Sequence, residues 1–359
     1  GVNCLNDLLA ALNHPELETE KVYQPRIRAE DLLREGTGQD TGDFREVAGQ
    51  ENAKRGAEIA AAGFHNLLMI GPPGVGKSMV AGRIPGILPP LTLKESLEVT
   101  GIFSVAGLLP PGQALITRRP FYAPHHTVTQ AALIGGGSGI PRPGMVSLAH
   151  RGVLFLDELP EFRKNVLDGM RQPMEERKVQ IARSAGMVTY PSDFILVAAM
   201  NPCPCGYYPD RNKCRCTQPQ IEKYLGKISG PILDRIDLCV ELHPVDILHL
   251  QKTKTEKSSE DMKRQIRHAR ERQAERFAGT DCRFNGDIRS ALVEEYCPLG
   301  EEGQKVMEQL YRTLQLSARV YHRILKTART IADLEDREEI TGEHLLEAAC
   351  YRPSETYWN

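Results

Sequence analysis

The 359-residue chain has no excess of charge of one sign, no long apolar run and no internal repeat. Its 45 Lys and Arg nearly balance 47 Asp and Glu, and the formal net charge of −2 excludes a wholly basic nucleic-acid coat, although not a local basic surface. No apolar stretch reaches the roughly 18 residues that a membrane-spanning helix needs, so we expect no membrane partner. With 41% hydrophobic and 26% charged residues, the composition is that of a globular chain of two or three domains.

The nine cysteines are not arranged as a disulfide framework, because their number is odd and four of them fall in one short segment. This pattern favours an intracellular, cytoplasmic protein with one local metal site. Four thiolates in a loop rich in proline and glycine suit a structural, tetrahedral Zn²⁺, while free thiols and disulfides are the alternatives. The zinc candidates are Cys203, Cys205, Cys214 and Cys216.

Short apolar runs bounded by turn residues predict a parallel sheet. Three of four runs are continuously apolar, which is typical of strands buried on both faces, whereas the fourth contains one polar residue and suits an edge. A fifth strand is expected between residues 90 and 150. We therefore predict an α/β fold with three αβα layers around a central five-stranded parallel sheet. The four runs are 67–70, 153–156, 194–199 and 238–242.

Other segments have equally distinct patterns. An Ala-rich helix is expected over 50–62, and a capping box starts another helix at Thr92. Residues 100–145 are dense in glycine and proline and predict a functional insertion, and residues 178–190 alternate as a β-hairpin. From residue 246 onward the pattern is helical, with one long helix ending near residue 331.

A phosphate-binding motif of the form G-x-x-x-x-G-K-[ST] lies between the first predicted strand and a helix. Its glycines let backbone N–H groups surround phosphate oxygens, and the following helix directs its positive end at the anion. Lys77 is expected to neutralise the β- and γ-phosphates of ATP, and Ser78 to bind Mg²⁺. The predicted ATP-binding residues are Gly71, Pro72, Pro73, Gly74, Val75, Gly76, Lys77, Ser78 and Met79.

Polar residues follow two of the predicted buried strands, at the sheet edge where ligands bind in such folds. Asp157 and Glu158 follow the run 153–156. We expect Asp157 to hold Mg²⁺, and Glu158 to orient and deprotonate the attacking water. Asn201 ends the next strand and could hold that water beside the γ-phosphate, or serve only as a strand-end cap.

At these motifs the sequence resembles the AAA+ ATPases of the magnesium-chelatase-like group, specifically the ComM/YifB family. The resemblance implies an AAA+ ATPase core over 43–245, a C-terminal helical lid over 246–359 and a cysteine-rich loop over 203–216. Family members also carry an N-terminal domain resembling the Lon protease domain, which these residues lack, so residues 1–42 would be the joining segment. The motifs that carry the resemblance are 71–78, 119–127, 154–158, 201–206 and 230–238.

The resemblance also implies that each site lies between two subunits. Arg235 would be the arginine finger that a neighbour inserts, unless it only pairs with Asp234 or Asp237. Arg319 would be the second sensor, touching the γ-phosphate from the lid, with Arg323 as its competitor one turn on. A solvated helix face is the alternative for Arg319.

By the same resemblance, the chain would form a homo-hexameric ring that translocates on DNA as a branch-migration helicase in recombination or natural transformation. Lys178 and Arg183 on the hairpin, with Arg118 and Arg119 in the insertion, are the candidate DNA contacts, and plain solvated side chains are the alternative.

A second interpretation is the ATPase subunit of a metal chelatase that acts on a protein partner. A third, a nucleotide-gated scaffold with slow turnover, is disfavoured because the candidate hydrolysis residues are complete. The adjacent His125 and His126 are expected to pack or give polar support rather than bind a metal together.

Overall fold

The computed structural model describes residues 42–111, 113–137, 141–183, 186–245, 257–353 and 357, with the backbone alone at residue 183. The predicted joining segment, apart from Gly42, and the first part of the predicted helical domain, 246–256, lie outside the described residues. Among the helices of the described part, none has the length and apolar character that crossing a bilayer requires.

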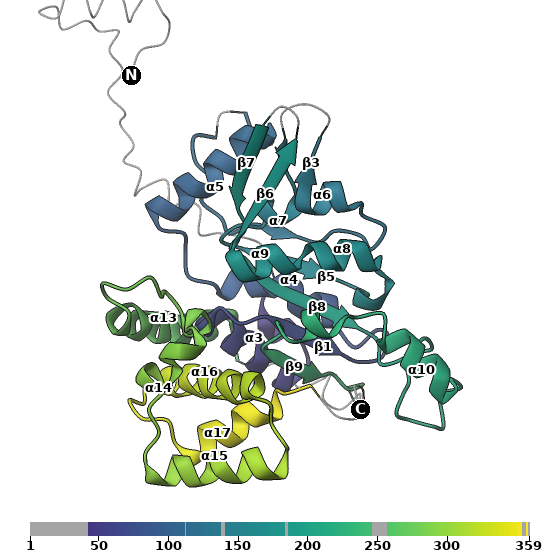
Figure 1. The fold of residues 1–359 in the computed structure, drawn as a ribbon, viewed down its shortest axis with the longest axis vertical. Coiled ribbons are helices and arrows are strands. Elements are labelled where there is room, and N and C mark those ends of the chain that lie inside the picture. Colours follow the sequence, from purple (N-terminus) through teal and green to yellow (C-terminus); the bar gives the residue numbers. More distant parts are fainter. Residues whose placement is uncertain are drawn as a thin grey trace, which may run out of the picture.

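A five-stranded parallel sheet forms the centre of the molecule (Figure 1), which confirms the predicted fold class. Its strand order is β2-β5-β8-β1-β9. The edge strand predicted near residue 240 is confirmed as β9, whereas the fifth strand, β2, spans only two residues and pairs only with β5. So short a strand has no periodic pattern, which is why the sequence did not place it. The strands are β1 (Leu67–Ile70), β2 (Phe121–Tyr122), β5 (Val153–Leu156), β8 (Ile195–Met200) and β9 (Leu238–Glu241).

Successive residues of each central strand enter different cores, because side chains alternate across a sheet. Leu67 and Met69 pack with α3 (Glu51–Gly63) and α4 (Lys77–Ile87) on one face. Leu68 and Ile70 pack on the other. The second face is covered by helices that include α8 (Lys164–Gly169), α10 (Gln218–Leu225) and α11 (Gly230–Leu233). Both faces of the sheet are thus buried, as the continuously apolar runs predict.

The segment between β1 and β5 contains several helices and short strands outside the central sheet. The capping box predicted at Thr92 is present: its Oγ1 accepts from the N–H of Glu95 at 3.2 Å, and Oε2 of Glu95 accepts from the N–H of Thr92 at 3.1 Å. Elements of this segment are α5 (Leu93–Ala106), α6 (Gln130–Ile134), β3 (Gly135–Gly136), β4 (Arg142–Pro143) and α7 (Met145–Leu148).

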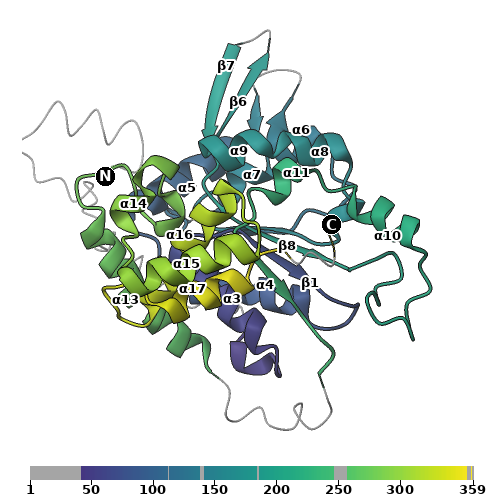
Figure 2. The same ribbon diagram turned by 60° about the horizontal axis from the view of Figure 1, so that its bottom comes forward.

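The predicted hairpin is confirmed as β6 (Lys178–Arg183) and β7 (Gly186–Pro191), which follow α9 (Arg171–Glu176). Its strands pair in register, with Ile181 opposite Val188. Figure 2 shows this hairpin extending away from the central sheet. Short 3₁₀ helices lie at Phe44–Glu46, Leu159–Glu161, Asn285–Asp287 and Ser290–Leu292.

The C-terminal residues fold as helices that pack beside α3 (Figure 1), with α13 and α16 nearest to it. The long helix expected from the apolar spacing corresponds to α16. Asp333 of that helix is buried and accepts from Arg276 of α13 at 2.6 Å, which ties the two helices together. The helices are α13 (Ser259–Arg276), α14 (Val293–Tyr296), α15 (Glu301–Thr313), α16 (Ala318–Leu334) and α17 (Gly342–Cys350).

Candidate nucleotide-binding site

The motif at 71–78 forms an open backbone cradle. It begins where β1 ends, and α4 begins at Lys77. Gly74 and Gly76 have φ angles of +79° and +95°, the left-handed region that glycine adopts without steric cost. A Cβ on either glycine would meet no heavy atom within 4 Å, so this face of the loop is open. An open glycine loop at a helix N-terminus fits a bound phosphate.

Lys77 lies across this cradle. Its Nζ donates to the carbonyl oxygens of Gly71 and Pro72, at 2.6 and 2.9 Å, and to Oδ1 of Asn201 at 3.0 Å. Burial lowers the pKa of Lys77, although the two carboxylates that follow β5 act to raise it. The ammonium is therefore held between the glycine loop and the end of β8.

Ser78 and Asp157 offer two hard oxygen ligands side by side. The Ser78 hydroxyl donates to Oδ2 of Asp157 at 2.9 Å, and Oδ1 of Asp157 accepts from the N–H of Glu158 at 2.9 Å. This donor set fits Mg²⁺, which prefers carboxylate and hydroxyl oxygens. Glu158 has a φ of +52°, and such left-handed backbone at a residue other than glycine is concentrated in functional sites.

One cavity of about 340 Å³ brings the predicted groups together. It is lined by residues 73–79, by Asp157 and Glu158 from the end of β5, and by Asn201 from the end of β8. The three segments meet because the C-terminal ends of parallel strands share one edge of the sheet. The arrangement can bind a polyphosphate and a divalent cation and can place a carboxylate beside them.

His126 also reaches this site, which the sequence reasoning did not foresee. Its Nδ1 lies 3.2 Å from Oε2 of Glu158. The ring lies against that of His125 in a tilted arrangement with centroids 4.1 Å apart, and Nδ1 of His125 lies 2.9 Å from the Thr127 hydroxyl. His126 follows β2, which pairs with β5, so its position after that strand places it near Glu158. The sequence could not show this, because a two-residue strand has no recognisable pattern.

The two predicted arginines lie elsewhere. Neither Arg235 nor Arg319 lines the cavity at the glycine loop. Arg235 pairs with Glu175, and burial lowers the pKa of Arg235, with the charges of Arg319 and Arg171 lowering it further. The expected alternative, an ion pair of Arg235 with an adjacent aspartate, is therefore not the observed arrangement.

Arg319 forms an ion pair with Asp234, so the expectation of a γ-phosphate contact from the lid is not met within one chain. Arg319 is kept from the cavity by the tertiary packing, because the start of α16 lies near residue 234 rather than over the glycine loop. Arg323, the competitor, donates to the carbonyl of Ile236 and also lies outside the cavity lining.

The candidate DNA contacts divide into three cases. Lys178 and Arg118 are exposed. The side chain of Arg183 lies outside the described residues. Arg119 corrects the expectation: its side chain is 10% exposed and donates to the carbonyls of Pro89 and Arg151, so it holds loops together and cannot reach a DNA phosphate.

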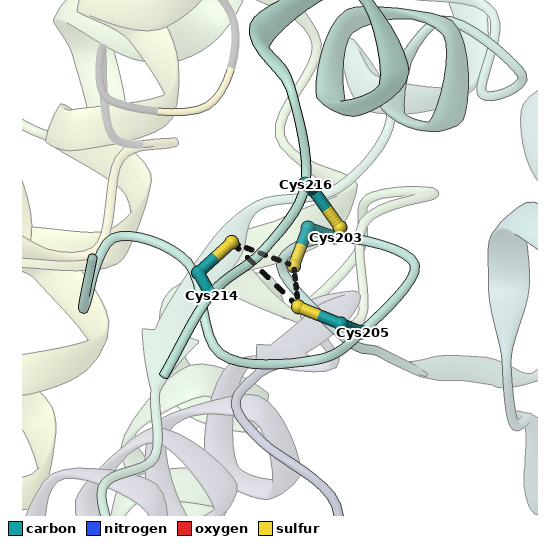
Figure 3. Close-up of side chains that lie close together, drawn as sticks. All are labelled: Cys203, Cys205, Cys214 and Cys216. Atoms are coloured by element: carbon teal, nitrogen blue, oxygen red, sulfur yellow. Dashed lines mark hydrogen bonds between the residues drawn. The ribbon is translucent and has the colours of Figure 1, made fainter. Parts of the chain in front are cut away.

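The four clustered cysteines converge on one point (Figure 3), with their Sγ atoms all within 4.8 Å of one another. Cys203 lies 3.3 Å from Cys205 and 3.8 Å from Cys214, sulfur to sulfur. These separations are those of free thiols, so the disulfide alternative is not the observed state. Four sulfurs at this spacing could hold one metal ion.

Backbone N–H groups point at these sulfurs. The N–H of Tyr208 donates to Sγ of Cys203 at 3.4 Å. Burial acts to raise the pKa of Cys205, but hydrogen bonds from the backbone of Tyr207 and Arg215 lower it to about 6. Such donors stabilise thiolates, the form in which cysteine binds metals.

The fold and the site define a P-loop ATPase fold of the AAA+ type. The family model for magnesium chelatase, subunit ChlI, matches residues 43–250, and that for the subunit ChlI C-terminal region matches 256–352. The chain therefore belongs to the magnesium chelatase ChlI family of AAA+ ATPases, in the group that contains ComM and YifB.

Individual relatives agree with this placement. The chain is 43% identical to the competence protein ComM of Haemophilus influenzae, covering 97% of this chain and 66% of that protein. It is 46% identical to the uncharacterized protein YifB of Salmonella typhimurium, covering 87% and 60%. A 25% identity relates it to the magnesium-chelatase 67 kDa subunit of Chlorobaculum parvum, covering 62% and 34%. The chain thus spans 60–66% of the length of its ComM and YifB relatives.

Proposed function

We propose that this protein binds ATP with Mg²⁺ and hydrolyses it as an AAA+ motor, with a core over 43–245 and a helical lid over 246–359. The observation that carries the proposal is the convergence of Lys77, Ser78 and Asp157 on one open cavity. A glycine cradle beside an ammonium and two cation ligands is suited to a triphosphate and to few other ligands.

Each group has a chemical task in this proposal. Lys77 and the loop N–H groups hold the β- and γ-phosphates, and Ser78 and Asp157 hold Mg²⁺, which neutralises phosphate charge when bound. Glu158 accepts the proton of the attacking water. Asn201, whose Oδ1 contacts Lys77, orients that water. His126 fixes the carboxylate of Glu158 through their 3.2 Å contact.

We propose that an adjacent subunit in a homo-hexameric ring contributes arginine side chains to each nucleotide site. Arg235 and Arg319 lie close enough for their charges to interact, and neither lines this chain's own nucleotide cavity, which leaves both for a neighbour's γ-phosphate in this proposal. A cation supplied in this way stabilises charge on the transferring phosphoryl group and is worth about 10³-fold or more in rate.

We further propose that the ring moves on DNA as a branch-migration helicase in recombination or natural transformation. The relative named competence protein ComM supports this, as does the hairpin that extends from the body (Figure 2). Lys178 on that hairpin and Arg118 are exposed and can meet phosphates. Arg183 belongs to the same hairpin backbone.

The second candidate is the motor subunit of a metal chelatase acting on a protein partner. The match to the magnesium chelatase ChlI family model favours it. The fold and the hydrolysis chemistry are the same in both proposals, so the substrate alone separates them.

We also propose that Cys203, Cys205, Cys214 and Cys216 hold a structural Zn²⁺. Four soft ligands leave no open position for catalysis. We also propose a cytoplasmic location, where such thiols stay reduced. Metal analysis of freshly purified protein is expected to find about one zinc per chain, and a content near zero would remove the zinc proposal.

The deciding experiment measures ATP turnover with single-stranded, duplex and branched DNA, and separately with a chelatase-type partner protein. DNA is expected to raise turnover several-fold, about the effect of ordering a catalytic site. Stimulation by the partner but not by DNA would favour the chelatase proposal. The matched variant Glu158→Gln is expected to retain nucleotide while losing turnover by about 10²-fold or more, and a variant with normal turnover would contradict the assignment of the base.

A further inference from the structure

We propose that the zinc loop at residues 203–216 braces the nucleotide site, so that metal occupancy sets the affinity for nucleotide. The inference rests on the proposed binding of zinc and of ATP, and adds a coupling between them. Two direct links join the metal candidate to the glycine loop.

The first link runs along the backbone after β8. Asn201 holds Nζ of Lys77 at 3.0 Å, and Cys203 follows two residues later with its side chain completely buried. Fixing the sulfur of Cys203 to a metal therefore restrains the residue that contacts the phosphate-binding lysine. The start of the glycine loop is tied to the same strand end, because the N–H of Gly71 donates to the carbonyl of Met200 at 3.2 Å.

The second link is a packing contact between the two loops. Gly206 is buried and has a φ of +87°. A Cβ at this position would lie only 2.6 Å from Cδ of Pro73, so the zinc loop lies directly against the glycine loop. The N–H of Gly206 donates to the carbonyl of Cys203 at 3.0 Å, which joins this contact to the first metal ligand.

Besides the metal candidate, the loop is held by turn hydrogen bonds and by the packing of Cys203 and Cys214 in the core. In this fully described stretch, no helix or strand lies between Met200 and Gln218. Most side chains from residue 207 to 213 are exposed, so burial of apolar surface contributes little there. A tetrahedral metal would tie the two C-x-C pairs together across this exposed turn. Without it the contacts of Gly206 and Cys203 would relax, and Pro73 and Asn201 would lose their support.

The test measures binding of a fluorescent ADP analogue with Mg²⁺ to the whole chain in three states: as purified with zinc, stripped with a mercurial reagent that is then removed with dithiothreitol in the presence of a chelator, and reloaded with ZnCl₂. Affinity is expected to fall about tenfold on stripping, the scale of losing one supporting contact, and to return on reloading. Equal affinity in the stripped and loaded states would overturn the coupling.

Two variants test the metal site and the packing link separately, and a third variant is the control. Cys205→Ser removes a half-buried ligand and is expected to lose zinc and bind nucleotide about tenfold more weakly. Gly206→Ala keeps all four thiols, and is expected to retain zinc yet weaken nucleotide binding. Wild-type affinity in this variant would overturn the packing link between Gly206 and Pro73. Cys350→Ser, which removes an exposed cysteine on α17, is expected to change neither quantity.

The outcomes also distinguish this coupling from the proposed ATP binding and the proposed zinc binding on which it rests. Zinc-loaded protein that binds no nucleotide would refute the proposed ATPase. Purified protein without zinc would refute the metal site and this coupling together. Nucleotide binding that ignores the metal would refute the coupling alone.

Discussion

Nδ1 of His126 lies 3.2 Å from Oε2 of Glu158, so the segment that leaves β2 contacts the carboxylate that follows β5. The imidazole limits the positions that this half-exposed carboxylate can take. His126→Ala is therefore expected to lower kcat roughly tenfold or more, because a misplaced base costs rate, with little change in nucleotide affinity. Steady-state ATPase kinetics and direct nucleotide titration measure the two quantities.

The neighbouring histidine is the control for this prediction. His125 contacts Thr127 rather than Glu158, so His125→Ala should cost less kcat. Equal losses in the two variants would mean that the two contacting rings act only as packing.

Arg235 tests whether sites are shared between subunits. Arg235→Ala and Lys77→Ala are each expected to lose turnover, by about 10³-fold for the arginine. In rings mixed from equal amounts of both, about a quarter of the sites would combine an intact glycine loop with an intact arginine from the next subunit. Activity should therefore reappear on mixing. A mixture as inactive as its components would show that the arginine does not act across an interface.

The hairpin and the insertion test the DNA proposal. Lys178→Ala and Arg118→Ala should weaken DNA binding similarly for all sequences. Each lost phosphate contact should also reduce the slope of the logarithm of the binding constant against the logarithm of the salt concentration by about one. Fluorescence anisotropy over a range of salt concentrations measures both effects. Lys305→Ala is the control, since this exposed lysine lies on α15, at the far end of the molecule from the hairpin in Figure 1. A loss in the control equal to that in the variants would refute a specific contact.

His150 makes stability depend on pH. Its side chain is 3% exposed, and burial, helped by the charge of Arg151 and opposed by Glu98, lowers the pKa of His150 to about 4. The unfolded chain binds this proton more readily, with a pKa near 6.5, so the stabilisation is complete above pH 6.5 and is lost as pH falls toward 4. The loss is on the order of 3 kcal/mol at most.

Urea unfolding at pH 7 and pH 5 measures this effect. The wild-type protein should lose more stability between the two values than His150→Gln, which has no imidazole to protonate. The variant is also expected to be less stable at pH 7, because Nδ1 of His150 accepts from the N–H of Asp193 at 3.0 Å. Equal pH dependence in both proteins would contradict the assignment.

The elements that are visible in local sequence were predicted correctly. The continuously apolar runs specified buried parallel strands, and the glycine motif placed Lys77 at the start of a helix. Asp157 and Asn201 could be assigned to one edge because parallel strands end there together. The N-cap at Thr92 was equally clear, since a capping box is a contact between near neighbours in sequence.

The remaining features depend on contacts between residues far apart in sequence. Amino-acid order determined four of the five strands, the glycine cradle and the cysteine cluster, because each follows from short-range pattern or spacing. Only the tertiary structure decided that Arg119 is buried among carbonyls, that Arg319 lies beside Asp234, and that His126 meets Glu158. Burial and pairing of charged side chains depend on which distant segments pack around them, and local periodicity carries no record of that packing.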